Sequence, residues 1–231
     1  MIGTIARVTL KRISRGQAVW VAFGIAMLPV IVAVFLRQAI SDAHDRVGMT
    51  IDLYVVEMFV LAVVPALFVA SSIGEEIEDR TVTYLWSRPL PRWHVLAGKL
   101  VALAPIAGVL VLGGWLLAIG VAYDRLAPVS TILAIAFATL AVSCVAAGIG
   151  TLAPKHGMAL TIIYMLLFDL PIGEIPASLQ ILSISHQTRL LAGIGPHGVH
   201  DSAKLAPAIT IAVLAGIWLV AGLWKIGRTE A

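Results

Sequence analysis

The sequence predicts an all-α integral membrane protein with six transmembrane helices. Of its 231 residues, 60% are hydrophobic and 13% are charged, and the mean hydropathy is +0.98. Because a soluble domain carries about 25% charged residues, this chain has too little polar surface to be soluble. Six apolar runs approach the length of about 20 residues that a membrane span needs. With no repeat and no second soluble region, residues 1–231 are expected to form a single transmembrane domain.

The six expected spans follow one another with short polar connections. They are Ala18–Leu36, Leu53–Ile73, Leu96–Ala122, Val129–Leu152, Gly157–Leu170 and Leu205–Trp224. Pro29 and Pro65 lie inside the first two, where proline favours a kink. The fifth is short, because Pro171 and Gly173 are expected to break it.

The basic segment 1–17 alternates apolar residues with Arg7, Lys11, Arg12 and Arg15. This pattern suits an amphipathic helix in the head-group plane. The alternative is a frayed tail that only sets orientation. The apolar run that follows is too long for a signal peptide's hydrophobic region of about 7–15 residues, so we expect it to remain as an anchor.

The densest charge of the chain lies between the second and third apolar runs, at residues 74–92. Acids come first, at Glu75, Glu76, Glu78 and Asp79, and arginines follow at Arg80, Arg88 and Arg92. The helical period places Ile77, Thr81, Tyr84 and Leu85 on one face. We expect a short amphipathic helix with its acids in the first turn, ended by Pro89 and Pro91. An ordinary solvated loop is the alternative.

The run from Glu75 to Arg92 resembles the loop between spans two and three of type-2 (ABC-2 type) ABC transporter permeases. In that family an acidic patch, a Thr/Ser-hydrophobic step and an R-P-x-x-R ending recur, and here Arg88, Pro89 and Arg92 supply the ending. The resemblance implies that residues 74–92 form a cytoplasmic coupling helix, which docks on a separate ATPase subunit. The residues expected to make that contact are Glu75, Glu76, Glu78, Asp79, Arg80 and Thr81.

The resemblance also implies a function and partners. The chain would be a permease subunit of an ATP-driven exporter, in a bacterial or archaeal cell (inner) membrane. A homodimer, or a dimer with a similar permease, would form the pathway, and two P-loop ATPase copies would bind ATP and Mg. The alternatives are a non-transport scaffold that recruits a soluble ATPase, and a stand-alone channel. Few polar residues lie deep in the spans, which disfavours the channel.

Lysine and arginine set the expected orientation, since cytoplasmic loops carry an excess of both. With a cytoplasmic N-terminus, eleven fall on the cytoplasmic side and five, namely Arg37, Arg46, Arg125, Arg189 and Lys204, fall outside. Both termini and residues 74–92 are therefore expected in the cytoplasm. This argument does not depend on the resemblance.

Two acids lie within the spans, where an ionisable residue is a candidate functional site. Glu57 is near the outer end of the second run and Asp169 near the outer end of the fifth. They are possible pathway residues that bind a cationic group or gate release. The alternative, which we favour, is that both meet head groups, water or Arg37 at the interface.

The outer loop 171–204 is rich in Leu and Ile, and we expect a helix or helix pair over Ile175–Leu191. His186, His197 and His200 lie in the same loop, but without a completing cluster we expect no metal site.

Several catalytic classes lack support in the sequence. No G-x-x-x-x-G-K-[ST] occurs, so a partner must supply any ATP site and the chain is not expected to be an enzyme. No H-E-x-x-H, G-x-S-x-G or C-x-x-C occurs either. The lone Cys144 allows no intrachain disulfide.

Overall fold

The computed structural model describes residues 3, 9, 17–39, 46–78, 93–175, 178–195, 198–199 and 205–228. Within these residues, six helices are long and apolar enough to cross a membrane, which confirms the expected number of spans. They are Gln17–Gln38, Met49–Glu75, Trp93–Tyr123, Val129–Leu152, Pro154–Glu174 and Leu205–Arg228, called spans one to six below. Most of the expected helix at residues 1–17, and residues 79–92, lie outside the described residues.

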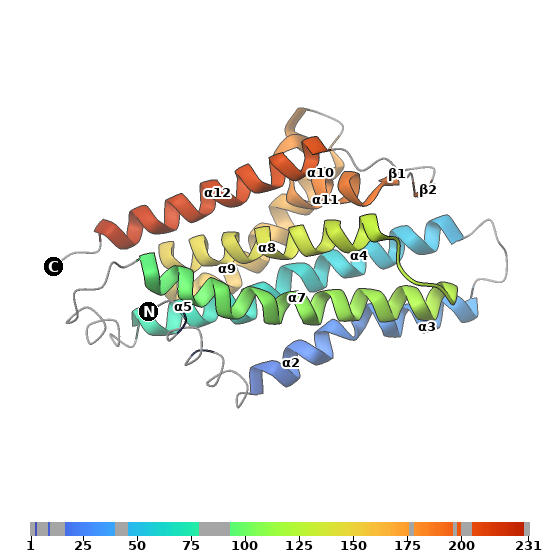
Figure 1. The fold of residues 1–231 in the computed structure, drawn as a ribbon, viewed down its shortest axis with the longest axis horizontal. Helices are drawn as coiled ribbons and strands as arrows, with labels where there is room; N and C mark the ends of the chain where they lie inside the picture. Colours follow the sequence, from blue (N-terminus) through green and yellow to red (C-terminus); the bar gives the residue numbers. More distant parts are fainter. Residues whose placement is uncertain are drawn as a thin grey trace.

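Spans one, two and five are each built from several helical segments, whereas the other three spans are single helices (Figure 1). Span one contains α2 (Gln17–Ala26) and α3 (Leu28–Ala39), and span two contains α4 (Arg46–Pro65), the π-helix η2 (Ala66–Ala70) and α5 (Ser71–Glu78). Spans three and four are α7 (Trp93–Tyr123) and α8 (Val129–Leu152). Span five joins η3 (Pro154–His156), α9 (Gly157–Ile163), the π-helix η4 (Tyr164–Asp169) and α10 (Leu170–Glu174). Then follow η5 (Ser178–Leu182), α11 (Ile184–Ala192), a two-stranded antiparallel pair β1 (Ile194–Gly195) and β2 (Gly198–Val199), and span six, α12 (Leu205–Arg228).

Prolines interrupt the spans without ending them. Span one breaks at Met27, two residues before Pro29, and Pro65 directly precedes the π turns of η2. The expectation that Pro171 and Gly173 end span five is wrong, because the helix continues to Glu174 and becomes extended only at Ile175. Proline crowds the carbonyl of the preceding turn. Here that turn is already widened, since the Leu170 N–H bonds the carbonyl of Met165, five residues back.

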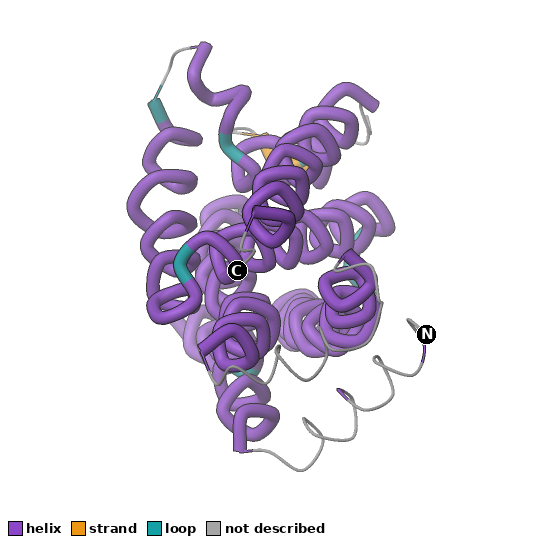
Figure 2. The backbone as a smooth tube through the Cα atoms, turned by 90° about the vertical axis from the view of Figure 1, so that its left-hand side faces the viewer, coloured by secondary structure: helices purple, strands orange, loops and turns teal. Residues whose placement is uncertain are grey.

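The bundle has two distinct ends (Figure 1). At the acidic end, α5 reaches Glu78, α7 begins at Trp93, α8 meets η3, and α12 ends at Arg228. At the hairpin end lie the last residues of α3 and α7, together with α11 and the β1–β2 hairpin. Seen along the bundle, the spans run side by side (Figure 2). At 31 residues, α7 is about 46 Å long, which exceeds a hydrocarbon core of about 30 Å.

Spans two and four form the centre of the bundle. Of their apolar windows 78% and 67% are buried, against 22% for spans one and six. Exposed apolar side chains follow a helical stripe along α12, at Ile209, Val213, Ile217 and Val220. Such a surface suits lipid or another apolar protein face.

Most polar side chains inside the spans form hydrogen bonds with backbone carbonyls of their own helix. Thr139 donates to the carbonyl of Ile135, Ser143 to that of Thr139, and Thr161 to that of Gly157, each at 2.7 Å. A hydroxyl that bonds the previous turn needs no partner from a ligand. These three residues are therefore structural.

Two adjacent glycines of α7 provide a matched test of the packing between spans one and three. A Cβ on Gly114 would lie 2.2 Å from the Ala26 carbonyl oxygen, whereas a Cβ on Gly113 would meet nothing within 4 Å. We expect Gly114→Ala to lower the free energy of unfolding by about 1–3 kcal/mol, because overpacking forces the backbones apart. Gly113→Ala should be neutral, or stabilising by up to about 1 kcal/mol through helix propensity.

The measurement is thermal unfolding of the two full-length variants in the same detergent. Equal unfolding midpoints for both variants would contradict the packing described here.

Candidate functional site

The acidic residues end the long helix of span two. Glu75, Glu76 and Glu78 lie in the last turns of α5, which continues from η2 without a break. The expectation that these acids occupy the first turn of a new helix is therefore wrong. Past Ile73 the helix packs closely against span five at Gly74, where a Cβ would lie 2.4 Å from the Pro154 carbonyl oxygen. The side chain of Glu75 is exposed.

Asp79, Arg80 and Thr81 lie outside the described residues, and so do the side chains of Glu76 and Glu78. Their expected contact with an ATPase stays a prediction. Because α5 and span two are one helix, any force applied at Glu78 acts directly on span two.

Lys99 is the buried cation of this end. Its side chain is 1% exposed in the second turn of α7, and its Nζ donates to the Ser72 carbonyl and to the Ser72 Oγ at 3.1 Å. The carbonyl of Ser72 belongs to the last turns of span two, where a cation is favoured by the helix dipole. Through these hydrogen bonds, Lys99 links the beginning of span three to the end of span two.

Glu57 lies deep inside the protein. It is 0% exposed in α4, and neither carboxyl oxygen has a hydrogen-bond partner among the described residues. The interfacial alternative, in which Glu57 meets head groups, water or Arg37, is therefore wrong. Arg37 instead binds Asp124 with two hydrogen bonds, of 2.6 and 2.9 Å.

Asp169 is also buried, but all its contacts are made within the protein. Its side chain is 2% exposed and accepts hydrogen bonds from the backbone N–H groups of Ile184 at 2.7 Å and Ser185 at 2.9 Å. The hydroxyl of Ser185 also donates to it. The carboxylate thus sits at the N-terminus of α11, where a helix favours negative charge. The interfacial alternative is wrong for Asp169 as well.

Three spans hold α11 at the hairpin end. Besides Asp169 of span five, the Tyr54 hydroxyl of span two donates to the Ser185 carbonyl at 2.7 Å. Ser130 of span four donates to the Ala192 carbonyl at 3.3 Å. A helix or helix pair was expected over Ile175–Leu191, and the structure has two, η5 and α11, while the β1–β2 hairpin was not predicted.

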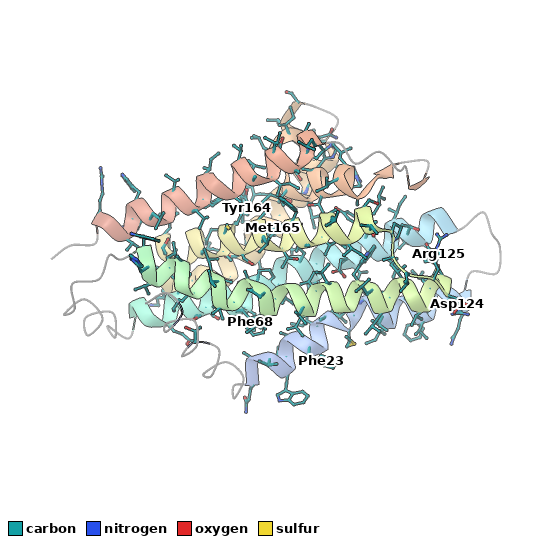
Figure 3. The ribbon with its side chains drawn as sticks, viewed as in Figure 1. Phe23, Phe68, Asp124, Arg125, Tyr164 and Met165 are labelled. Atoms are coloured by element: carbon teal, nitrogen blue, oxygen red, sulfur yellow. The ribbon has the colours of Figure 1, made fainter. Side chains whose placement is uncertain are left out.

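The turn between α7 and α8, where Figure 3 labels Asp124, carries one ion pair of the hairpin end. Asp124 has a φ of 52° and points to Arg37, which also donates to the Val121 carbonyl at 2.6 Å. Asp tolerates this left-handed conformation better than most residues. Both side chains are well exposed, so solvent screens the pair and it adds little to stability.

The histidines of the outer loop do not form a metal site in the described part of the chain. His197 and His200 lie outside it. Burial and the nearby Arg189 guanidinium lower the pKa of His186, against the smaller opposing effect of the Gly173 carbonyl. His186 also packs closely against Gly173, where a Cβ would lie 3.2 Å from the His186 Cβ.

The sequence reasoning missed some of the residues that organise these sites. Lys99 was counted only as a cytoplasmic charge, although it lies inside the expected span and the rule for ionisable residues within spans already applied to it. Ser183 and Ser185 had a weaker signal, since serine before an apolar run is a common start of a helix.

The fold and these sites define a multi-pass membrane protein whose second span ends in an acidic helix. A family model described as "ABC-2 family transporter protein" matches residues 48–184, more than half of the chain. The chain therefore belongs to the ABC-2 family of transporter proteins, which are membrane components of ABC transporters. The match runs from span two to the first residue of α11 and includes the acidic segment. No curated protein matches the chain.

Asp169 and Glu174 offer a matched pair of carboxylates for a test of how α11 is held. Asp169→Ala removes a buried acceptor and leaves two buried N–H groups unpaired, so we expect a loss of about 1–3 kcal/mol of stability. Glu174→Gln weakens an exposed pair with Arg189 at 2.8 Å and should cost less than about 1 kcal/mol.

Thermal unfolding and limited proteolysis at residues 175–195 give the comparison. If Glu174→Gln opened this segment to protease as much as Asp169→Ala, the anchoring role of Asp169 would be disproved.

Proposed function

We propose that the chain is the permease subunit of an ATP-driven exporter, and that it forms half of a translocation pathway. The observation that carries this proposal is the family match over residues 48–184, which spans the acidic segment and the helices on both sides of it. ATP and Mg would be bound by a separate P-loop ATPase, two copies of which would complete the transporter. The direction of transport rests on the resemblance of residues 75–92 to exporter permeases.

We place the acidic end in the cytoplasm of a bacterial or archaeal cell membrane. Lys99, Lys155, Lys225 and Arg228 lie near this end, and Arg37, Arg46, Arg125 and Arg189 lie near the opposite one. Together with the basic residues of 1–17 and 79–92, the excess of positive charge favours the cytoplasm for the acidic end and for both termini. Arg228 stacks on Trp224 at 4.0 Å, as suits a residue pair at a membrane interface.

The contact with the ATPase would be made by Glu75, Glu76, Glu78, Asp79, Arg80 and Thr81. A push on these residues would tilt span two, because α5 continues directly into it. Span three would follow through the bond of Lys99 to Ser72. Alternating access would then arise from movement of spans two and three against a second permease chain.

The second permease chain would be an identical copy or a similar permease. The apolar stripe on α12 and the exposed Trp20 and Phe23 of α2 offer surfaces for lipid or for that second chain. Glu57 and Asp169 are enclosed within one subunit, so we assign neither of them to cargo contact in this conformation.

Charge reversal tests the coupling surface. We expect Glu76→Lys together with Asp79→Lys to weaken co-purification of the ATPase and to reduce its ATP hydrolysis by at least about tenfold, since about 1.4 kcal/mol of lost interaction has that effect. Asp52→Lys is the control, because Asp52 is an exposed acid near the opposite end of span two. Unchanged ATPase binding and hydrolysis in the double variant would remove the coupling role from this segment.

The composition of the complex tests the wider proposal. The tagged chain, purified from its native membrane in mild detergent, should give an intact mass that fits two permease chains and two P-loop ATPase chains. A homodimer or lone chain without ATPase would favour a channel. A complex whose ATP hydrolysis responds to no added solute or lipid would favour a scaffold.

A further inference from the structure

Two polar side chains in the centre of the bundle have no hydrogen-bond partner among the described residues. They are Glu57 of α4, through both carboxyl oxygens, and Trp115 of α7, through its indole Nε1. Each is 0% exposed. An unpaired buried polar group is costly, and the cost is higher for a charged one. Their presence in an otherwise apolar interior therefore calls for an explanation beyond packing.

The two groups lie at the same depth on neighbouring antiparallel helices. Thr50 of α4 hydrogen-bonds to Tyr123 of α7 toward the hairpin end, and Ser72 bonds Lys99 toward the acidic end. From Thr50, Glu57 is seven residues along α4, and from Tyr123, Trp115 is eight residues back along α7. Both steps are about 11–12 Å long. A spacing of seven also keeps Glu57 on the face of α4 that Thr50 turns toward α7.

The described helices packed against α4 bring no neutralising cation to Glu57. The elements α2, η2 and α9 carry no titratable side chain. Those on the remaining neighbours are Arg37 of α3, His94, Lys99 and Tyr123 of α7, Cys144 of α8, Tyr164 and Asp169 of η4, and His186 and Arg189 of α11. The strong cations among them have other partners, since Arg37 binds Asp124, Arg189 binds Glu174 at 2.8 Å, and Lys99 binds Ser72. On α4 itself, Tyr54 donates to the Ser185 carbonyl.

We propose that Glu57 is a proton-binding site enclosed between spans two and three, with the Trp115 indole as its polar neighbour. The ligand is a single proton, which converts the carboxylate to a neutral carboxylic acid. In the conformation seen here Glu57 holds the proton, because burying a charged carboxylate without a counter-ion would cost several kcal/mol of desolvation. The proton leaves when spans two and three separate at this depth and water reaches the carboxyl. The site belongs to this chain alone and does not depend on the proposed transport function.

Asp169 is a second buried carboxyl group, and it differs from Glu57 in having hydrogen-bond donors around it. It is almost as buried as Glu57, yet it accepts hydrogen bonds from two backbone N–H groups and the Ser185 hydroxyl at a helix N-terminus. Such donors stabilise an ionised carboxylate. Asp169 is therefore the internal control, a buried acid whose oxygens have hydrogen-bond donors within the protein.

The test is infrared spectroscopy of the full chain in lipid nanodiscs, at about pH 7. We expect a carboxylic-acid C=O stretch that shifts in D2O and is absent from Glu57→Gln, which keeps the shape and neutrality of the protonated side chain. Asp169→Asn should leave the band in place. A wild-type spectrum without the band, or a band that persists in Glu57→Gln, would overturn the proposal. The wild-type measurement decides the question even where a variant fails to fold.

Two further measurements separate a proton from other ligands and test Trp115. Replacing a bulky organic cation in the buffer by sodium or potassium should leave the band unchanged, and its loss would identify a metal-cation site instead. Trp115→Phe should move the band to higher frequency, because the carboxylic acid loses the dipole of the indole that we propose as its polar neighbour. An unmoved band would remove Trp115 from the site.

Discussion

The close backbone contacts of span four are the constraint on which the rest of the bundle depends. Gly148 lies against the Trp218 carbonyl of span six, and Gly150 lies against Ala70 of span two and Gly157 of span five. In lipid, helices gain little from hiding apolar surface, so association rests on tight packing between small residues. Spans two, five and six are thereby fixed to span four toward the acidic end. With Gly74 against Pro154, α5 is part of the same packed unit.

Within this framework the buried polar groups divide into two kinds. Lys99 and Asp169 each bond the end of another helical segment, so their charges are compensated and they fix the positions of span three and α11. Glu57 bonds nothing in the described chain, although it is as deeply buried. A group that stabilises no neighbour and is costly to bury has no structural reason to be there. Burial alone does not separate the two kinds, whereas hydrogen-bond satisfaction does.

The sequence predicted the spans well because apolar length is a strong signal that each segment carries on its own. Span four was placed at Val129–Leu152 without error, since turn residues bound it on both sides. Span five was misjudged at Pro171, because the widened turn at Tyr164–Asp169 that accommodates the proline leaves no mark in composition. The burial of Glu57 was missed for a related reason. Depth in a span can be counted from the sequence, but the face that meets a neighbouring helix cannot.

The two π-helical segments show where the packed unit can bend. η2 lies in span two directly after Pro65, and η4 lies in span five just before Pro171. Irregular backbone inside a membrane is tolerated only where protein encloses it, and η2 is largely buried, with α8 packed against it. Under the proposed function, a force applied at α5 reaches η2 before it reaches α4. Bending at η2 would leave the packed acidic end intact and displace the part of α4 that carries Glu57. The proposed proton-binding site at Glu57 is thus on the side of the bend that moves.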